Sequence, residues 1–274
     1  PEWQLLRCPI SLREFEELPF VRSLFFRYGL YFVDEDIQAI LRTDSSGAVT
    51  VRIGMPSYMT PSLIFHYNLK LIENYATGIR NDNGTDTYDG VVLKRFVMQT
   101  VSSNIVSFRV HLPGSGSYIM DIFANSTTPK EYVTGEPMKF KSVCKFKILC
   151  HELHTVMIPL PDCASGEWGP LKATRLFDLV PLTHEEALIF SPRDLEIQFR
   201  MSRPLTDFMS SLHRNGSDER KLARFVTVLI DDNDDLVSFR ITFPDEGQYG
   251  LDIYTREQHS NEMYNIDKQL LTHC

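Results

Sequence analysis

A long internal repeat constrains the fold of this chain more than any other feature. The stretch VSFRVHLPGSGSYIMDIF runs from Val106 to Phe123, and VSFRITFPDEGQYGLDIY runs from Val237 to Tyr254. The two copies align without a gap at an offset of 237 − 106 = 131 residues. The whole chain has 274 residues, a length that suits two domains. The repeat therefore predicts two similar domains in tandem.

Both copies of the repeat show the alternation of β-strands. The apolar positions are Val106, Phe108, Val110 and Leu112 in the first copy and Val237, Phe239, Ile241 and Phe243 in the second. A period of two indicates a strand with one buried face. PGSG and PDEG follow as turns, and a second alternating strand comes after each. Alternation also relates residues 63–69 to residues 195–201, at 195 − 63 = 132, which extends the predicted repeat upstream.

The residues after each turn are typical of an immunoglobulin-type sandwich. In such folds a tyrosine near the start of strand F returns its hydroxyl to the backbone at a corner, and a disulfide cysteine can follow two residues later. Tyr118 and Tyr249 occupy the corner position, and Met120 and Leu251 stand where the cysteine would be. We therefore predict an all-β chain of two tandem immunoglobulin-like β-sandwich units, with a short N-terminal helical leader.

The leader is predicted to cover residues 1–30. Ser11 and Glu14 have the spacing of a capping box, which indicates a first short helix. A second helix is expected to begin at Pro19 and to end at Gly29, since proline is favoured at helix starts and glycine just past helix ends.

The two sandwich units are predicted at residues 31–127 and 138–259. Polar linkers follow each copy of the repeat, and Cys274 then aligns with Cys144, in the strand expected to open the second unit. Residues 260–274 are therefore expected to be a tail or the start of a further repeat.

Charge and cysteine content limit the partners and the compartment. The net charge is −8 and the pI is about 5.5, so nucleic acid is a poor partner. No apolar stretch approaches the roughly 20 residues of a membrane-spanning helix. Five cysteines without a C-x-x-C pair indicate a reducing, intracellular compartment. Three N-x-S/T sequons, at Asn83, Asn125 and Asn215, favour the alternative of an extracellular adhesion module.

Two stretches resemble a known family. WQLLRCPISLREFEELPFVRSLFF, from Trp3, resembles the segment that closes the transglutaminase-like core in the kyphoscoliosis peptidase/hillarin family. GEWGPLKATRLFDLVPLTHEEALIF, from Gly166, resembles that family's Trp-Gly-Pro…Pro-Leu-[Ser/Thr]-His signature in its immunoglobulin-like repeats. The first unit lacks this signature and matches less well. The resemblance implies a cytoplasmic, cytoskeleton-associated protein, some of whose relatives carry LIM domains.

No catalytic, cofactor or metal site is expected in this chain. The Cys-His-Asp core that the family resemblance implies would lie upstream of Pro1, and no residue here matches it. Cys8 has no histidine near it in sequence. Cys150, His151, His154 and Cys163 lack the paired spacing of a metal site, and the acidic run at residues 231–235 lacks the glycine and glutamate of a calcium loop. Trp168 is expected to anchor a core rather than to bind a partner.

A lysine stripe is the one candidate for partner binding. Lys139, Lys141, Lys145 and Lys147 are expected to share one face of a strand. This stripe either protects an edge strand from pairing with other chains, the interpretation we favour, or docks an acidic protein surface. The predicted function is a non-catalytic protein–protein interaction and spacer module for a cytoskeletal or other intracellular protein. The alternatives are an accessory part of an upstream transglutaminase-like or peptidase core, and the extracellular module.

Overall fold

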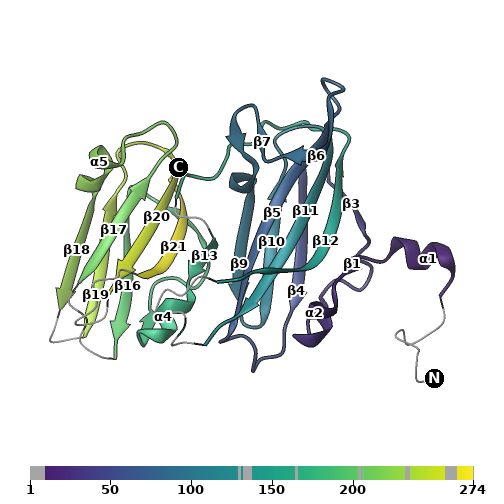
Figure 1. Ribbon diagram of the computed structural model, residues 1–274. Helices are drawn as coiled ribbons and strands as arrows, with labels where there is room; N and C mark the ends of the chain where they lie inside the picture. The colour runs from purple at the N-terminus through teal and green to yellow at the C-terminus, as the bar shows by residue number, and fades with distance from the viewer. Residues whose placement is uncertain are drawn as a thin grey trace. The chain divides into compact units, whose positions relative to one another are not determined.

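The computed structural model describes residues 10–128, 131, 138–163, 166–202, 205, 207–231, 235–256 and 264–273. The chain divides into two units (Figure 1). The first comprises Pro1–Val97 and Ser103–Ile158, and the second comprises Met98–Ser102 and Pro159–Cys274. Within the described residues no helix is long and apolar enough to cross a membrane.

The first unit has two layers of strands. One layer has the order β12-β11-β5-β6, with β1 and β3 both pairing with β12, and the other contains β2, β4 and β10. Its elements are α1 (Leu12–Glu17), β1 (Phe20–Val21), α2 (Ser23–Arg27), β2 (Tyr31–Phe32), β3 (Ile40–Arg42), β4 (Ala48–Gly54), β5 (Leu63–Asn74), β6 (Arg80–Thr85), β7 (Thr87–Tyr88), β8 (Val91–Val92), η1 (Leu93–Phe96), β10 (Ile105–His111), β11 (Gly116–Ser126) and β12 (Lys141–Cys150).

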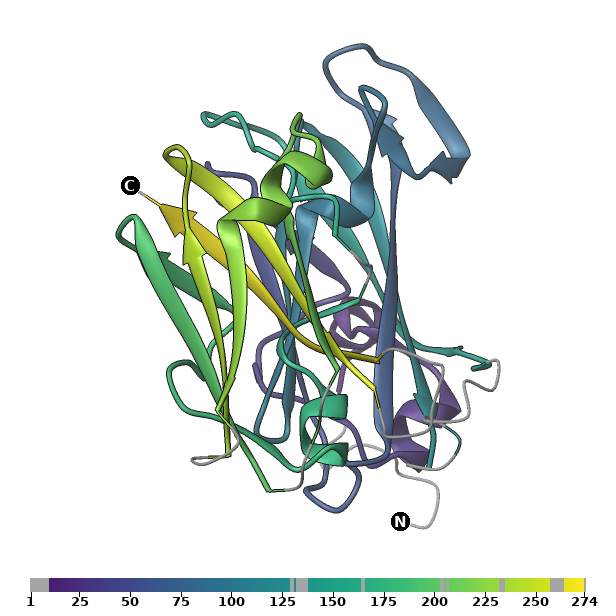
Figure 2. The same cartoon turned by 90° about the vertical axis from the view of Figure 1, so that its left-hand side faces the viewer.

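The second unit has the same two layers. One has the order β17-β20-β21, with β13 and β15 beside β21, and the other has the order β14-β16-β19-β18. Figure 2 shows its strands, green to yellow, running alongside one another. Its elements are β13 (Glu167–Pro170), α4 (Lys172–Leu176), β14 (Leu179–Pro181), β15 (Leu188–Ser191), β16 (Asp194–Met201), β17 (Phe208–His213), α5 (Glu219–Leu222), η2 (Ala223–Phe225), β18 (Val226–Asp231), β19 (Leu236–Thr242), β20 (Gly247–Thr255) and β21 (Tyr264–His273). β9 (Val97–Ser102) precedes β10, and its residues from Met98 onward belong to this unit.

The alternation that the sequence shows becomes the core of each sandwich. Val106, Phe108 and Val110 of β10 are fully buried, and so are their counterparts in β19. Aromatic rings from the two layers meet in each core. Phe108 of β10 lies 5.8 Å from Tyr67 of β5 in the first unit, measured between ring centroids. The fold prediction of two immunoglobulin-like sandwiches is therefore confirmed.

One predicted correspondence between the units is wrong. Residues 63–69 were expected to match residues 195–201, but β5 pairs with β11 whereas β16 pairs with β19. By its pairing partner, β16 is the counterpart of β4, and β5 is the counterpart of β17. The prediction failed because every half-buried strand alternates with period two, so alternation alone does not say which strand of a sandwich a segment forms.

The strand after each repeat closes its own unit instead of opening the next. β12 pairs antiparallel with β11 in the first unit, and β21 pairs antiparallel with β20 in the second. The boundaries predicted at residues 138 and 260 therefore cut each sandwich before its last strand. The register places Ile122 opposite Cys144 and Ile253 opposite Asp267, so Cys144 corresponds to Asp267 and not to Cys274. Cys274 itself lies outside the described residues.

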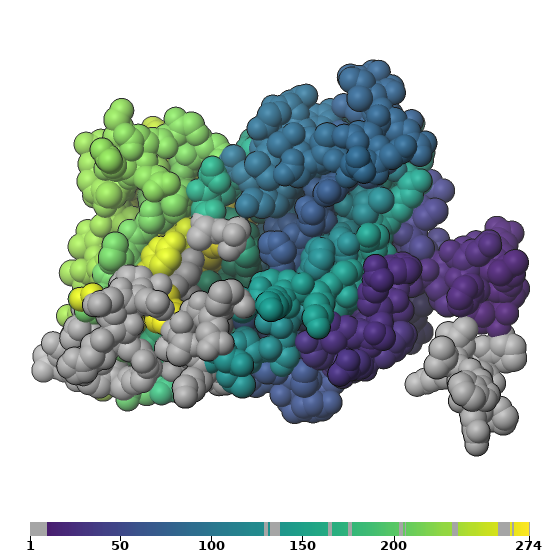
Figure 3. Space-filling view, in the orientation of Figure 1, coloured from purple at the N-terminus to yellow at the C-terminus, as the bar shows by residue number. Residues whose placement is uncertain are grey.

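The leader is only partly helical. α1 has the predicted capping box, in which the Ser11 hydroxyl accepts from the backbone of Glu14 and the Glu14 carboxylate accepts from the backbone of Ser11. α1 buries no side chain and projects from the rest of the first unit (Figure 3). The second helix begins at Ser23 and not at Pro19, because Phe20 and Val21 form β1 against β12.

Candidate functional site

Both predicted corner tyrosines bond to the backbone four residues before them. The Tyr118 hydroxyl donates to the carbonyl of Gly114 at 2.8 Å, and the Tyr249 hydroxyl donates to the carbonyl of Asp245 at 2.8 Å. Burial raises the pKa of both tyrosines. Met120 and Leu251 are fully buried at the position of the sandwich disulfide. These residues hold the turn before strands β11 and β20 and leave no group open to a ligand.

The lysine stripe is divided by a β-bulge. The register of β11 with β12 shifts between Ile122 and Phe123, so Val143 is inserted and the alternation of β12 reverses there. Lys141 lies opposite the buried Ala124, whereas Lys145 lies opposite Asp121 on the outer face. Since residues directly opposite each other point to the same face, Lys141 does not share the face of Lys145.

Lys145 and Lys147 remain together on the outer face of β12. Lys145 makes an ion pair of 3.1 Å with Asp121, which also accepts a hydrogen bond of 2.5 Å from Ser142. Lys147 is exposed. Lys139 precedes the strand and is also exposed. The four lysines thus form no single stripe.

β12 is not an edge strand, so the interpretation that its lysines protect an edge is wrong. β11 occupies one side of β12 along nearly its whole length. On the other side β1 pairs opposite Cys144 and Lys145, and β3 pairs opposite residues 147–149. A strand with partners on both sides offers few free backbone groups to another chain.

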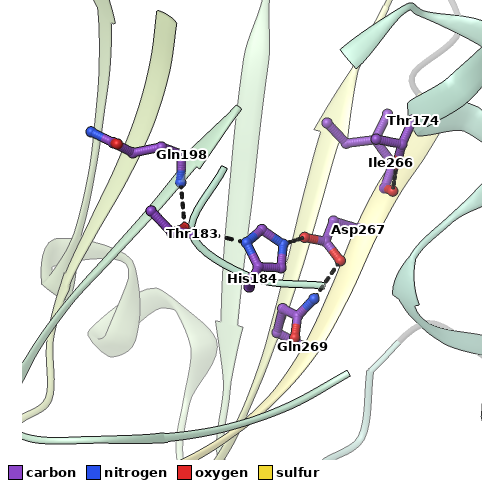
Figure 4. A network of polar contacts seen from close by, with 7 residues as sticks. All are labelled: Thr174, Thr183, His184, Gln198, Ile266, Asp267 and Gln269. Atoms are coloured by element: carbon purple, nitrogen blue, oxygen red, sulfur yellow. Dashed lines mark hydrogen bonds and ion pairs between the residues drawn. The ribbon is translucent and has the colours of Figure 1, made fainter. Parts of the chain in front are cut away.

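The stretch with the Trp-Gly-Pro signature assembles around β21. Trp168 of β13 is buried, with only 6% of its surface exposed, and Gly169 has a φ of +97°, which favours glycine. His184 lies in the interior of the sandwich, where its Nε2 is 2.5 Å from Asp267 of β21 (Figure 4). Gln269 donates to the other oxygen of Asp267 at 2.7 Å. A buried carboxylate needs such partners, so the signature provides the contacts that hold β21 in place.

Figure 4 also shows how two threonines extend this network. The Thr183 hydroxyl lies 3.3 Å from Nδ1 of His184 and accepts from the backbone of Gln198 at 3.0 Å. Thr174 of α4 donates to the carbonyl of Ile266. Helix α4 and strand β16 are thereby tied to β21 from two sides.

A second polar cluster lies on the opposite face of β20 and β21. Asp252 and Lys268 are opposite each other in the register, and both are buried. His213, the last residue of β17, has its Nε2 3.0 Å from a carboxylate oxygen of Asp252 and its Nδ1 3.0 Å from Glu219 of α5. The thiol of Cys163 completes the group, and the ligand atoms of Cys163, His213 and Asp252 all lie within 4.8 Å of one another.

Electrostatics in this cluster do not favour a reactive thiol. Burial raises the pKa of the Cys163 thiol, and the charge of Asp252 raises it further. Burial acts to lower the pKa of His213, but the carboxylates of Asp252 and Glu219 outweigh it, so the pKa is raised. A nucleophilic cysteine needs a lowered pKa and a histidine free to accept its proton. Here both ring nitrogens of His213 face carboxylates instead.

The metal candidates considered from sequence do not come together. Cys150, His151 and His154 belong to the first unit and Cys163 to the second. The His151 ring stacks on Tyr75 at 5.6 Å between centroids, and His154 lies 3.8 Å from Glu152. Cys8 and residues 232–234 of the acidic run lie outside the described residues.

Comparison with known proteins identifies the family. A family model described as KY-like, immunoglobulin-like domain matches residues 12–161 and 177–268. The chain belongs to the KY-like immunoglobulin-like family. It is 62% identical to Hillarin of Drosophila melanogaster over 284 aligned residues, which cover 100% of this chain and 34% of that protein. It is 52% identical to the Lim and transglutaminase domain protein ltd-1 of Caenorhabditis elegans over 272 residues, 99% of this chain and 36% of that protein.

Membership of the KY-like family confirms the resemblance found in the sequence. The chain spans about a third of the length of the two relatives. The two matched ranges follow the two sandwiches, and the first match ends at residue 161, after β12. The family model therefore also includes β12 with the first sandwich.

Sequence reasoning missed His213, Asp252 and the pairing of His184 with Asp267. Cys163, His213 and Asp252 are separated by 213 − 163 = 50 and 252 − 213 = 39 residues, too far for a motif. One signal was present, since Gly250 interrupts an alternating strand, and such a glycine often marks a close approach of another group.

Proposed function

We propose that this chain is a non-catalytic interaction and spacer module of a longer, cytoskeleton-associated, transglutaminase-like protein. The observation that carries the proposal is the match to an immunoglobulin-like family model over both sandwiches. Support for the longer parent comes from the relatives, of which this chain covers about a third. The name of one of them includes a transglutaminase domain.

The geometry around Cys163 supports the absence of catalysis. Among the described cysteines, Cys163 is the one whose sulfur lies near a histidine and a carboxylate. That histidine has a carboxylate oxygen 3.0 Å from each ring nitrogen. In a nucleophilic triad one ring nitrogen faces the nucleophile and only the other faces a carboxylate.

The proposed docking surface is the outer face of β5, β11 and β12. The register places Ile119 of β11 between Lys147 of β12 and Lys70 of β5. Lys145 lies in the next outward row, with part of its charge offset by Asp121. A basic row on a chain of net charge −8 can orient an acidic protein surface. We therefore assign partner binding to Lys145 and Lys147, with Lys70, rather than to the whole predicted stripe.

A cytoplasmic location is part of this proposal. Cys144, Cys150 and Cys163 are free thiols. Met120 and Leu251 fill the positions where an extracellular sandwich would carry its disulfide. These observations disfavour the extracellular adhesion module.

A second candidate function, packing against an upstream catalytic core, rests on α1. Leu12 and Phe15 of this helix are 73% and 61% exposed. Apolar side chains exposed on a short helix suit a surface that another domain covers. In that case the leader would help to complete the parent enzyme, while the two sandwiches keep their interaction role.

The test compares charge reversals on the two faces of β12. Wild type, Lys145→Glu/Lys147→Glu and the control Lys139→Glu/Lys141→Glu are used to capture proteins from cytoskeletal extract. A partner lost with the first variant and kept with the control supports the docking surface. The association rate of that partner with the wild-type chain should fall steeply as the salt concentration rises, while its dissociation rate changes little. Equal capture by all three proteins would contradict the assignment of the lysines.

A further inference from the structure

We propose that Cys163, His213 and Asp252 form a binding site for a zinc ion or a similar divalent transition metal. This inference is independent of the docking role. The three side chains supply one sulfur, one nitrogen and one oxygen ligand, all of which zinc accepts. They come from three separate segments of the second unit, namely the stretch before β13, the end of β17 and the middle of β20.

The spacing of the ligand atoms suits one ion. The three atoms lie within 4.8 Å of one another, and Nε2 of His213 is 3.0 Å from the carboxylate oxygen of Asp252. A nitrogen and an oxygen bound to one tetrahedral zinc are about 3.3 Å apart, given bond lengths of about 2.0 Å. Three protein ligands leave a fourth position for water or another group.

Glu219 holds His213 in the orientation that a metal ligand requires. Its carboxylate lies 3.0 Å from Nδ1, so Nδ1 can keep its proton when a metal ion takes the place of the proton on Nε2. Histidines that bind metals usually donate their second nitrogen to a carboxylate in this way. Glu219 is itself placed by the first turn of α5, where Asp218 caps the helix by accepting from the backbone of Arg220.

Gly250 provides the space in which the sulfur sits. A Cβ on this residue would lie 2.2 Å from Sγ of Cys163, so a larger residue there would displace the thiol. Gly250 is opposite His213 in the register and two residues before Asp252. The missing side chain of Gly250 therefore leaves room for the sulfur on the face of β20 that carries Asp252.

The first unit shows that this arrangement is not a general feature of the sandwich. At the repeat offset of 131, Gly250 corresponds to Ile119 and Asp252 to Asp121. The Asp–Lys pair recurs, since Asp121 is opposite Lys145 as Asp252 is opposite Lys268. The first unit has Ile119 where the second has the glycine, and Lys145 and Asp121 are partly exposed instead of buried.

Lys268 provides the alternative explanation for the cluster. It is buried beside Asp252, and its Nζ lies 5.5 Å from the ring centroid of Trp168. Without a metal, Lys268 would supply the positive charge that Asp252 needs, and the cluster would be a buried ion network. The experiment must therefore distinguish a site that takes up metal from one that does not.

The test uses the full chain without an affinity tag, stripped with chelator and then dialysed against zinc or cobalt. We expect one metal ion per chain, a rise in Tm with zinc, and the charge-transfer band of a cobalt–thiolate bond. Cys163→Ser should abolish that band and the bound zinc. Glu219→Gln, which leaves all three ligands in place, should weaken zinc binding about 10- to 100-fold. His151→Gln/His154→Gln, in the first unit, is the matched control and should bind like wild type.

Two results would overturn the proposal. One is the absence of stoichiometric metal in the wild type, which would establish the ion network with Lys268. The other is metal binding that Cys163→Ser and Glu219→Gln leave unchanged, since the ion would then lie elsewhere. Far-ultraviolet circular dichroism of each variant verifies folding. If Cys163→Ser fails to fold, the Glu219→Gln affinity decides.

Discussion

At the scale of single residues, the two sandwiches differ most along their last strands. Cys144 and Phe146 point into the core from β12, whereas Asp267 and Gln269 occupy the corresponding positions of β21. Buried polar groups require partners, and His184 supplies one for Asp267. The signature with Trp168 and His184 therefore occurs in the unit whose last strand carries buried polar side chains that need hydrogen-bond partners. The first unit, whose equivalent positions are a cysteine and a phenylalanine, does without it.

The corner tyrosines give a first prediction. Tyr249→Phe removes the hydroxyl that bonds to Asp245 and leaves the ring in place. The free energy of unfolding should fall by about 1–2 kcal/mol, the range for a lost buried hydrogen bond. The midpoint of urea denaturation measures it, with Tyr58→Phe as the control because Tyr58 is 77% exposed. An unchanged midpoint for Tyr249→Phe would show that the corner bond contributes nothing in that unit.

The fit between Gly250 and Cys163 gives a second prediction. Gly250→Ala places a Cβ against Sγ of Cys163, and overpacking of this kind destabilises by about 1–3 kcal/mol. Adding Cys163→Ala removes the sulfur, so the double variant should regain part of that loss. Urea denaturation of both single variants and the double variant measures the coupling. Strict additivity would contradict the direct contact.

The pH dependence of stability gives a third prediction, through Lys172. Burial lowers the pKa of Lys172 to about 8, against the opposing charge of Glu167. In the unfolded chain its pKa is about 10.4, so between these values the unfolded state binds more protons. The contribution of Lys172 to the free energy of unfolding should therefore rise as the pH increases from about 8 to about 10.4.

Lys172→Met isolates this effect from the other groups that titrate in the same range. The difference in free energy of unfolding, wild type minus variant, should increase between about pH 7 and about pH 10. Denaturant midpoints at several pH values provide the measurement. A difference that stays constant with pH would show that the pKa of Lys172 is not lowered in the folded chain.

At the scale of elements, the sequence pattern placed the closing strand of each sandwich outside the unit to which it belongs. The strands that carry VSFR and the tyrosine corners could be predicted, because alternation, turn residues and the repeat all agreed on them. Lys141–Cys150 was recognised as a strand, but its pairing with β11 depends on which segments meet in space. The bulge at Val143, which moves Lys141 to the other face, is equally invisible in a pattern of period two.

The candidate sites were predictable to different degrees, because some contacts lie within one sequence motif and others depend on which strands pair in space. The tyrosines lie within the repeated motif, so their hydrogen bonds are local contacts across a turn. His213 and Asp252 come from different strands, and only the register of β17 with β20 brings them together. Gly250 was the single local sign of that contact.

The fourth prediction concerns β21. A chain that ends at residue 259 lacks Tyr264–His273, and with it the buried Asp267, Lys268 and Leu271. The second sandwich should then not fold, because β13, β15 and β20 all pair with the missing strand. Loss of β-sheet circular dichroism and exposure of Trp168, in a Trp3→Phe background, measure this.

A chain that ends at residue 158 is the matched comparison, since it keeps all residues of the first unit. It should retain a cooperative unfolding transition. A native-like second unit in the chain ending at residue 259 would mean that β21 is not needed to close the sandwich.

At the scale of the whole molecule, the chain combines two sandwiches of one family, and neither contains a catalytic arrangement among its described residues. The fifth prediction is that the purified chain has no transamidating or peptidase activity. Among the described cysteines, Cys163 is the one grouped with a histidine and a carboxylate; its sulfur lies against Gly250, and that histidine, His213, has both ring nitrogens beside carboxylates. A transglutaminase or cysteine peptidase needs the opposite, an accessible thiolate with a histidine that can accept and return its proton.

Incorporation of a labelled amine and cleavage of casein by the 274-residue chain are the measurements, with the longer parent protein assayed beside it. Activity in the parent alone would place the chemistry outside this chain and leave it the docking and spacing role. The strongest contrary result would be activity of the isolated chain that Cys163→Ser or Cys8→Ala abolishes. Because Cys8→Ala leaves the cluster of Cys163, His213 and Asp252 intact, the two variants would also show which thiol is responsible.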